Sequence, residues 1–460
     1  MLGVLIVLGA LTLLMTAAYR GYSVILMAPL AALLAVLVTD PSAVPGVYTG
    51  LFMDKLATFT KSYFPVFLLG AVFGKLIDIS GAAQALVSAS VALVGAQRAM
   101  LSIVAICAVL TYGGVSLFVV IFSVYPFAAS LFRQADIPKR LIPGTVVLGA
   151  FSFTMDALPG TPQIQNIIPS TFFSTDAWAA PVLGISGAVF IATSGLIYLE
   201  WRRRQARLAG EGYGGDPEAL VPASSMNPLM ALLPLLCVVA ANKMLSMAIP
   251  RYYGTAHQVH LPGMAVPLDI HVQQVTALWA IEGALTLGII AVIIIARGRV
   301  LARFTTDITP AVGGALLATM NTASEFGFGA VIASLPGFLA IRDALQSIAD
   351  PLWNVAISVS TLSGITGSAS GGMSIALAAL AYRFLASAHS AGIPPEVLHR
   401  IAAMASGGMD TLPHNGAVIT LLAVCGLTHR QSYRDIFAIT CVKTAGVGVV
   451  IGLYYMTGLV

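Results

Sequence analysis

Hydrophobic positions dominate the chain from one end to the other, in stretches long enough to cross a lipid bilayer. A helix needs about 20 apolar residues to span the hydrocarbon core. Runs at or near this length occupy residues 2–16, 24–38, 181–199, 226–248, 275–296 and 436–459. The pattern predicts an all-α polytopic membrane protein without an appreciable soluble domain.

Two polar stretches interrupt the apolar runs, and their charge indicates how the chain is oriented. The stretch at 201–220 is rich in arginine, whereas 251–271 contains a single arginine. Short loops rich in Lys and Arg stay on the cytoplasmic side of a membrane. We therefore expect the loop 201–222 to be cytoplasmic and the N-terminus periplasmic, in a bacterial inner membrane. The basic segment RGRVLAR at 297–303 agrees with this orientation, as a second cytoplasmic loop.

An internal repeat is visible in short, ordered sequence matches. Four pairs follow one another at nearly constant separation: MDALP (155–159) with MDTLP (409–413), ADIP (135–138) with AGIP (391–394), YGGVS (112–116) with SGGMS (370–374), and FLLGAV (67–72) with FGFGAV (326–331). The chain is therefore expected to consist of one repeat at 1–200, a cytoplasmic linker at 201–222 and a second repeat at 223–460.

The charge of equivalent loops indicates that the two repeats are inverted. Segment 132–140 carries three basic residues, whereas its counterpart 389–400 carries one Arg and one Glu. The relation is reversed between 170–178, which has no basic residue, and 427–435, which has two arginines. Equivalent loops are thus predicted on opposite sides of the membrane, as in many secondary transporters.

Each repeat is expected to contain a re-entrant hairpin and a broken transmembrane helix. Arg98 and Arg133 both belong to the basic side, yet the apolar chain between them is interrupted only by glycines at 113–114. The second repeat offers a similar tip in ITGSASGG at 365–372. DALPGTPQ (156–163) and MDTLPHNG (409–416) contain prolines that prevent a continuous helix at the predicted breaks.

These interruptions are the predicted substrate site, because non-helical backbone at membrane depth is tolerated only where protein buries it or it lines a polar cavity. The N-terminus of a half-helix offers N–H groups to an anion. No arginine is expected at mid-membrane depth, so a bound carboxylate would depend on these N–H groups and on polar side chains. The alternative is that the prolines and glycines only kink packed helices. The candidate substrate-binding residues are Tyr112, Gly113, Gly114, Ser116, Thr161, Gln163, Asn166, Thr366, Ser368, Ser370, Gly371, Gly372, His414 and Asn415.

Four titratable residues are candidates for ion coupling, since ionisable groups inside a membrane are costly and usually functional. Asp156 and Asp410 occupy equivalent positions of the repeats, and each also has the alternative of capping the following half-helix. His414 titrates near neutral pH without a large shift and is the favoured proton carrier. Glu325 lies in an apolar stretch, either as a proton site or near the membrane surface.

Several kinds of function lack their motifs. There is no GxxxxGK[ST] loop for ATP, no HExxH or CxxC metal pattern and no GxSxG nucleophile. The four cysteines have no metal-ligand spacing. We therefore expect a protein that is not an enzyme, and no cofactor, metal or nucleic acid.

Four segments together resemble the gluconate permease family, over nearly the whole length of the chain. They are FGKLIDISGAAQAL (73–86), YGGVSLFVVIFSVYPFA (112–128), ALPGTPQIQNIIP (157–169) and GGMDTLPHNGAVITLL (407–422). The resemblance places the chain in the ion transporter superfamily and implies proton-coupled uptake of hydroxylated monocarboxylates. It is strongest to the branch for short hydroxy acids such as 3-hydroxybutyrate. The apolar SLFVV after the first tip, where gluconate-type members carry an acidic residue, favours a smaller and more apolar acid.

The sequence thus predicts a proton symporter that imports a small organic carboxylate anion and works within the lipid bilayer, with a homodimer expected. Within transport, the alternatives are sodium coupling or a cation/proton antiporter that uses Asp156 and Asp410. A channel is a different class and would not need two symmetric broken helices. A membrane enzyme is the remotest alternative.

Overall fold

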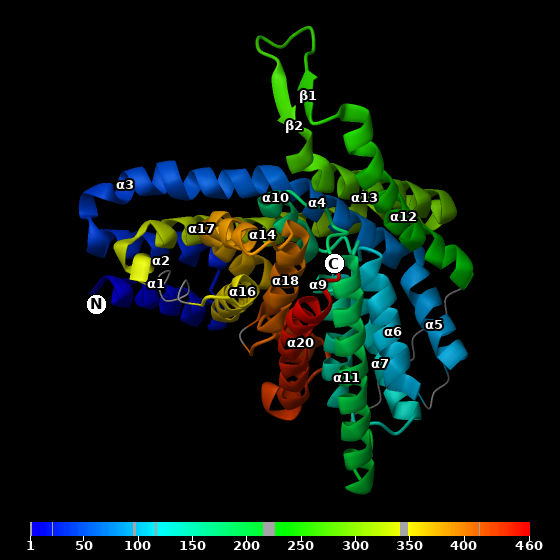
Figure 1. The fold of residues 1–460 in the computed structure, drawn as a ribbon. Helices are drawn as coiled ribbons and strands as arrows, with labels where there is room; N and C mark the ends of the chain where they lie inside the picture. The colour runs from blue at the N-terminus through cyan, green and yellow to red at the C-terminus, as the bar shows by residue number, and fades with distance from the viewer. Residues whose placement is uncertain are drawn as a thin grey trace.

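The computed structural model describes residues 2–20, 22–94, 98–115, 117–214, 226–340, 348–413 and 415–460 (Figure 1). Helices form nearly all of it. In the first half these are α1 (Leu2–Tyr19), α2 (Val24–Thr39), η1 (Pro41–Ala43), α3 (Val44–Gly46), η2 (Val47–Phe52), α4 (Met53–Ser80), α5 (Ala82–Val94), α6 (Ala99–Tyr112), α7 (Leu117–Gln134), α8 (Leu141–Ala150), α9 (Phe153–Asp156), α10 (Ile164–Phe173) and α11 (Pro181–Leu208).

The second half repeats this order. Its elements are α12 (Pro228–Tyr253), β1 (Ala256–Val259), β2 (Leu268–His271), α13 (Val272–Ile295), α14 (Arg297–Ser334), α16 (Pro351–Thr366), α17 (Ala369–Ser390), α18 (Pro395–Gly408), α19 (Gly416–Val424) and α20 (His429–Thr457). The hairpin α6–α7 corresponds to α16–α17. The broken helix α8–α9–α10 corresponds to α18–α19, and α11 corresponds to α20.

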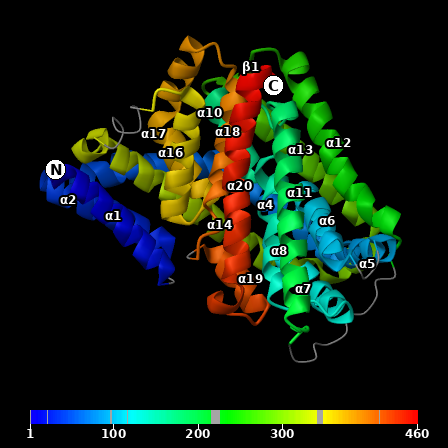
Figure 2. The same cartoon turned by 60° about the horizontal axis from the view of Figure 1, so that its bottom comes forward.

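Equivalent helices of the two halves run in opposite directions, which the packing of α11 against α20 makes explicit (Figure 2). Near the start of α11, the N–H of Val182 donates to the carbonyl of Val460 just beyond the end of α20, at 3.4 Å. Near the end of α11, Tyr198 and Arg202 contact Asp435 in the second turn of α20. The fold is therefore an all-α membrane fold with two inverted repeats, as the charges of the loops predicted.

Long helices surround the hairpins and broken helices. Helices α4 and α14 pack against each other. Helix α2 lies against α14 and carries α1 on its other side, and α13 lies against α4 and packs with α12. The α1–α2 and α12–α13 pairs therefore occupy opposite flanks of the molecule (Figure 2). Six helical segments of the described chain are long and apolar enough to cross a membrane: 41–80, α11, α12, α13, α17 and α20.

Three segments that polarity suggested as loops have regular structure instead. The more polar residues 40–61 follow the second apolar run, but the chain turns helical at Pro41 and continues into α4. The hydroxyls of Thr49 and Thr60 bond back to carbonyls four residues earlier, which hides their polarity within the helix. Segment 297–303 is the first part of α14, and 251–271 includes an antiparallel hairpin that projects from the helices (Figure 1).

Candidate functional site

The first hairpin tip is held against the first broken helix by side chains that satisfy exposed carbonyl groups. The hydroxyl of Tyr112 donates to the carbonyl of Pro159 at 2.8 Å. The amide of Gln163 donates to the carbonyls of Thr111 at 2.7 Å and of Val115 at 3.4 Å. The unwound chain at 157–163 and the tip are thus fixed to one another, as expected for paired interruptions in a membrane.

The second repeat uses the same device. The amide of Asn415 in the second break donates to the carbonyl of Gly367 in the second tip, at 2.7 Å. Gly367 adopts a left-handed conformation with φ of 66°, and Gly114 in the first tip has φ of 93°. Glycine is the residue that adopts these angles readily. Both hairpins therefore turn at a glycine and are tied to their own broken helix by an amide side chain.

The half-helix N-termini are not equally available to an anion. The oxygen of Asn415 accepts from the N–H groups of Ala417 and Val418, so it caps α19. Ser368 caps α17 by accepting from the N–H of Gly371. By contrast, Gln163 precedes α10 without capping it. Among these three half-helices, α10 therefore presents the first turn that no side chain caps.

A buried ion pair lies at the middle of the molecule. The ammonium group of Lys443, halfway along α20, is 2.7 Å from the carboxylate of Asp410 and donates to the carbonyl of Phe151 at 2.9 Å. The side chains of Lys443 and Asp410 are 1% and 4% exposed. Such a pair does not necessarily stabilise the fold, because the free energy needed to remove two charges from water often exceeds the free energy of their attraction.

Arg400 is fully buried in α18 and braces the first break. Its guanidinium donates to the carbonyl of Ala179 at 3.2 and 2.7 Å, to the carbonyl of Asp156 at 3.2 Å and to the side-chain oxygen of Asn166 at 2.9 Å. The sequence places no arginine within the predicted breaks, but the fold brings Arg400 of α18 into contact with the first one. The helix begins at Pro395, so that Arg400 is already more than one turn inside the fold.

Among the described residues, Asp156 lies near these cations without a direct hydrogen-bond or ion-pair partner. It is 1% exposed. Neither carboxylate oxygen receives a hydrogen bond from another described residue. One oxygen rests against Gly407 of α18, where a side chain would occupy the same space. Lys443, Asp410 and Arg400 are the charged groups that act on it. The two repeat-related aspartates thus share one cluster, in which Asp410 is paired and Asp156 is not.

His399 adds a second polar contact to the same region. Its Nδ1 is 2.6 Å from the hydroxyl of Thr175, and its Nε2 is 3.3 Å from the side-chain oxygen of Asn166. The amide of Asn166 donates in turn to the carbonyls of Thr161 and Ala177. Asn166 therefore connects α10 both to the break and to α18.

Glu325 is buried inside the fold. It is 5% exposed on α14 and hydrogen-bonds Ser368 in the second tip. Its Oε2 rests against Gly371 and has no hydrogen-bond partner among the described residues. The hydroxyls of Thr322 and Ser370 approach to 3.5 Å beside it. Glu325, Ser368, Ser370 and Gly371 thus form a second, smaller polar cluster.

The remaining predicted residues have different surroundings. A side chain at Gly113 would overlap Leu235 of α12, and one at Gly372 would overlap the backbone of Ser363, so both glycines allow close helix packing. Ser116 and His414 lie outside the described residues, as does the side chain of Thr366. The role proposed for His414 stays a prediction.

Three residues of the central cluster were missed from sequence: His399, Arg400 and Lys443. A signal existed for Lys443, because it is the only charged residue of the apolar run 436–459. A lone charge at membrane depth usually marks a functional or partnered site. His399 and Arg400 gave no such signal, because the glycine and prolines at 392–395 made the whole segment look like a loop.

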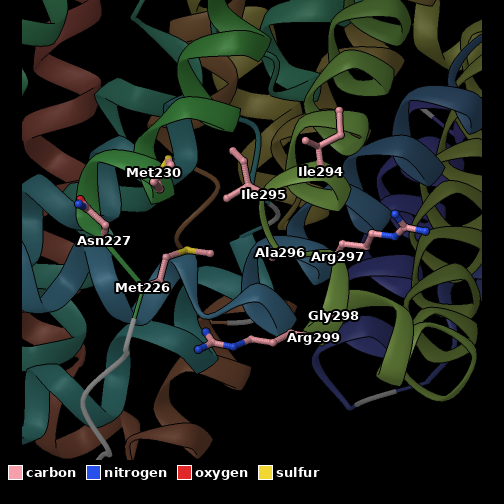
Figure 3. A pocket seen from close by; sticks show the side chains of 9 residues that line it. All are labelled: Met226, Asn227, Met230, Ile294, Ile295, Ala296, Arg297, Gly298 and Arg299. Carbon is pink, nitrogen blue, oxygen red and sulfur yellow. The ribbon is translucent and has the colours of Figure 1, made fainter.

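A cavity of about 510 Å³ lies away from this cluster, where the start of α12 meets the junction of α13 and α14 (Figure 3). Apolar side chains from α12 and α13 line one part of it, and Arg297 and Arg299 lie at its other end. It does not coincide with either predicted interruption.

Among the described residues, no group of three or more His, Cys, Asp or Glu could hold a metal ion.

The fold is that of a known membrane transporter. The chain superposes on the YdaH transporter of Alcanivorax borkumensis, described as having an unusual topology, with a TM-score of 0.54, 14% sequence identity and coverage of 90% of this chain and 89% of that one. No protein-family model matches the sequence. The chain therefore shares its fold with a known membrane transporter.

A closer relative places the chain in a family. It is 53% identical over 469 residues, 99% of each chain, to the uncharacterized transporter YxjC of Bacillus subtilis (strain 168). The chain belongs to the family of transporters that includes YxjC.

Proposed function

We propose that the protein imports a small organic monocarboxylate, such as a short hydroxy acid, across the bacterial inner membrane together with a proton. The resemblance of its motifs to the gluconate permease family supports the substrate class. The observation that carries the proposal is the central cluster. In it, Arg400 contacts the carbonyl of Asp156 and Lys443 contacts the carbonyl of Phe151, so two positive charges lie beside the first break. A buried carboxylate is costly unless it is paired with an opposite charge, and these two cations can supply that charge.

The geometry also supports a position for the anion. The first turn of α10 is not capped, and Thr111 and Thr161 each present a buried hydroxyl with no partner among the described residues. A carboxylate between the α10 N-terminus and the first tip would receive N–H and O–H groups and would benefit from the helix dipole. Gly114, Gln163 and Asn166 would then border the substrate, as the sequence predicted.

Alternating access would follow from movement of the hairpins and broken helices against the flanking helices. In this scheme α1–α2 and α12–α13 form the scaffold, embedded in the bilayer, and offer the surface of a homodimer. Orientation with the N-terminus in the periplasm and residues 201–222 in the cytoplasm is part of the same proposal.

Transport by the purified protein in proteoliposomes tests this function. Labelled 3-hydroxybutyrate and gluconate would be offered with a pH gradient or a sodium gradient imposed separately. We expect accumulation of the short hydroxy acid when only the pH gradient is present, and weaker uptake of gluconate. Accumulation driven by sodium alone would favour sodium coupling. Sodium or proton exchange without any organic acid would favour an antiporter.

A matched pair of variants links transport to the cluster. Arg400→Gln keeps hydrogen-bond donors but removes the charge, and is expected to abolish uptake of the acid. Arg383→Gln, on α17 and exposed, makes the same change outside the site and should transport normally. Normal uptake by Arg400→Gln would contradict the proposed anion site.

A further inference from the structure

The central cluster contains equal numbers of buried acids and bases. Asp156 and Asp410 lie opposite Arg400 and Lys443, and all four side chains are at least nine-tenths buried. The other ionisable groups that face this cluster are Tyr112 of the first tip, His399 of α18 and Asp176, which acts on Arg400. With both aspartates ionised, the four central side chains have no net charge.

The two aspartates differ in what they can do with a proton. Asp410 is paired with the ammonium of Lys443 at 2.7 Å, a contact that favours its ionised form. Asp156 receives no hydrogen bond from another described side chain or backbone group. It can therefore gain or lose a proton without the loss of an existing contact. A buried carboxylate without donors is costly in its charged form, and protonation removes that cost.

We infer that Asp156 carries the coupled proton, and that the charge of this cluster couples one proton to one monoanion. This inference rests on the proposed function. When Asp156 binds a proton, the cluster acquires one net positive charge and a monocarboxylate neutralises it. When Asp156 is ionised, the same anion would leave an uncompensated negative charge in a low-dielectric interior, which is strongly unfavourable. The empty and the fully loaded site are both neutral.

The surroundings of Asp156 favour a proton over a metal ion. The cations Arg400 and Lys443 act on Asp156 and oppose a bound proton and a bound metal ion alike, so the difference lies in the ligands and the space that each needs. Sodium would also need a shell of oxygen ligands, whereas a proton needs one oxygen atom. The contact of the carboxyl group with Gly407 leaves little space on that side for such a shell.

If the net charge of the four central side chains controls binding, one result is expected that the loss of a single contact would not produce. Lys443→Met lowers the charge of the protonated cluster from one to zero and is expected to weaken binding of the acid by about a hundredfold. The double variant Lys443→Met/Asp410→Asn restores one net positive charge and should recover binding. If the double variant binds no better than the single one, specific contacts of Lys443 matter and the charge count is wrong.

The proton site is tested with Asp156→Asn, which imitates the protonated form. We expect it to exchange labelled acid between equal internal and external pools but to lose accumulation driven by a pH gradient. Asp54→Asn, an exposed position on α4, is the matched control and should retain both activities. Wild-type uptake should also be unaffected by a membrane potential set with potassium and valinomycin. Accumulation by Asp156→Asn, or uptake driven by the potential in the wild type, would overturn the inference.

A spectroscopic measurement separates this inference from the proposed function. Infrared difference spectra of the purified protein, recorded as pH changes, should contain the carbonyl band of a protonated carboxylic acid that Asp156→Asn lacks. The band would remain visible even if 3-hydroxybutyrate were not the substrate, in which case only the proposed function fails. An unchanged band in Asp156→Asn would exclude Asp156 as the proton carrier.

Discussion

Two buried acids lie in direct contact with residues that have no side chain. Asp156 rests against Gly407, and Glu325 rests against Gly371. Each contact joins an acid of one segment to a glycine of a neighbouring one, α9 to α18 and α14 to α17. Each acid thus occupies the space that its glycine leaves free, and no sequence motif predicts these two contacts.

Gly371→Ala is expected to destabilise the protein by about 1–3 kcal/mol, because the new methyl group would overlap the Glu325 carboxyl group. Shortening the acid in Gly371→Ala/Glu325→Asp should recover much of the loss. Thermal unfolding in detergent measures both effects. Gly313→Ala, on α14 with open space around it, is the control and should not be destabilised. Equal melting temperatures for the wild type and Gly371→Ala would contradict this fit.

Sequence reasoning found the aspartates of the site but not their cations. Asp156 and Asp410 were identified because they recur in matching pentapeptides and stand beside prolines. Lys443 contacts Asp410 from α20, which follows both breaks in the sequence. Arg400 contacts Asp156 from α18, whose beginning could not be recognised because the prolines before it resemble a loop. Which cation contacts which aspartate depends on how the helices of the two repeats pack, and the pattern of hydrophobic positions in the sequence does not determine that packing.

At the scale of elements, three segments that were predicted to lie on the same side of the membrane meet in one charged network. Arg140, from the loop before α8, donates to Asp435 at 3.2 Å and pairs with Glu211 beyond α11 at 2.6 Å. Arg202 contacts the other oxygen of Asp435 at 2.6 Å. The network fixes the ends of α8, α11 and α20 to one another.

The two acids of this network are expected to differ strongly in their importance. Asp435 is 1% exposed, and Asp435→Asn leaves two arginines short of a negative charge, at an expected cost of about 3–5 kcal/mol. Glu211 is 39% exposed, and Glu211→Gln should cost about 1 kcal/mol or less. Thermal unfolding of both variants in detergent makes the comparison. A larger loss from Glu211→Gln would contradict the assigned burial.

The contribution of Glu211 should also depend on pH. The hydrogen bond from Arg140 lowers the pKa of Glu211 below its usual value of 4.5. A group with a lowered pKa in the folded state stabilises the protein above its unfolded pKa, and this stabilisation is lost as pH falls through the folded pKa. The difference in melting temperature between the wild type and Glu211→Gln should therefore be present at neutral pH and disappear in acid.

For the whole molecule, the inverted arrangement was predictable from the charges of four loops, because inversion places each loop and its counterpart in different compartments. The long helical segment at 41–52 and the β-hairpin were not predictable in this way. Polarity marks a segment as outside the hydrocarbon core, but it does not distinguish a loop from a helix that hides its hydroxyls or from a short hairpin.

The inversion has a direct test in labelling from each side of the membrane. Gln134, the last residue of α7, and Glu396, in the first turn of α18, are exposed and flank equivalent loops. Cysteines placed at these positions in a cysteine-free background should react with an impermeant maleimide from opposite sides. The background must lack all four native cysteines, because Cys441 is exposed. Labelling of both positions from the same side would contradict the inverted topology.

The two repeats have equivalent helices but different charged and polar residues, and this difference affects how the protein works from each side of the membrane. A machine made of two identical inverted halves would look the same from either compartment and would run equally well both ways. Here the cation Lys443 belongs to α20 alone, and Asn415 closes α19 while α10 stays open. The duplication supplies a reversible mechanism whose net direction the gradients set, and the few unmatched residues are where the affinities and rates from the two sides can differ.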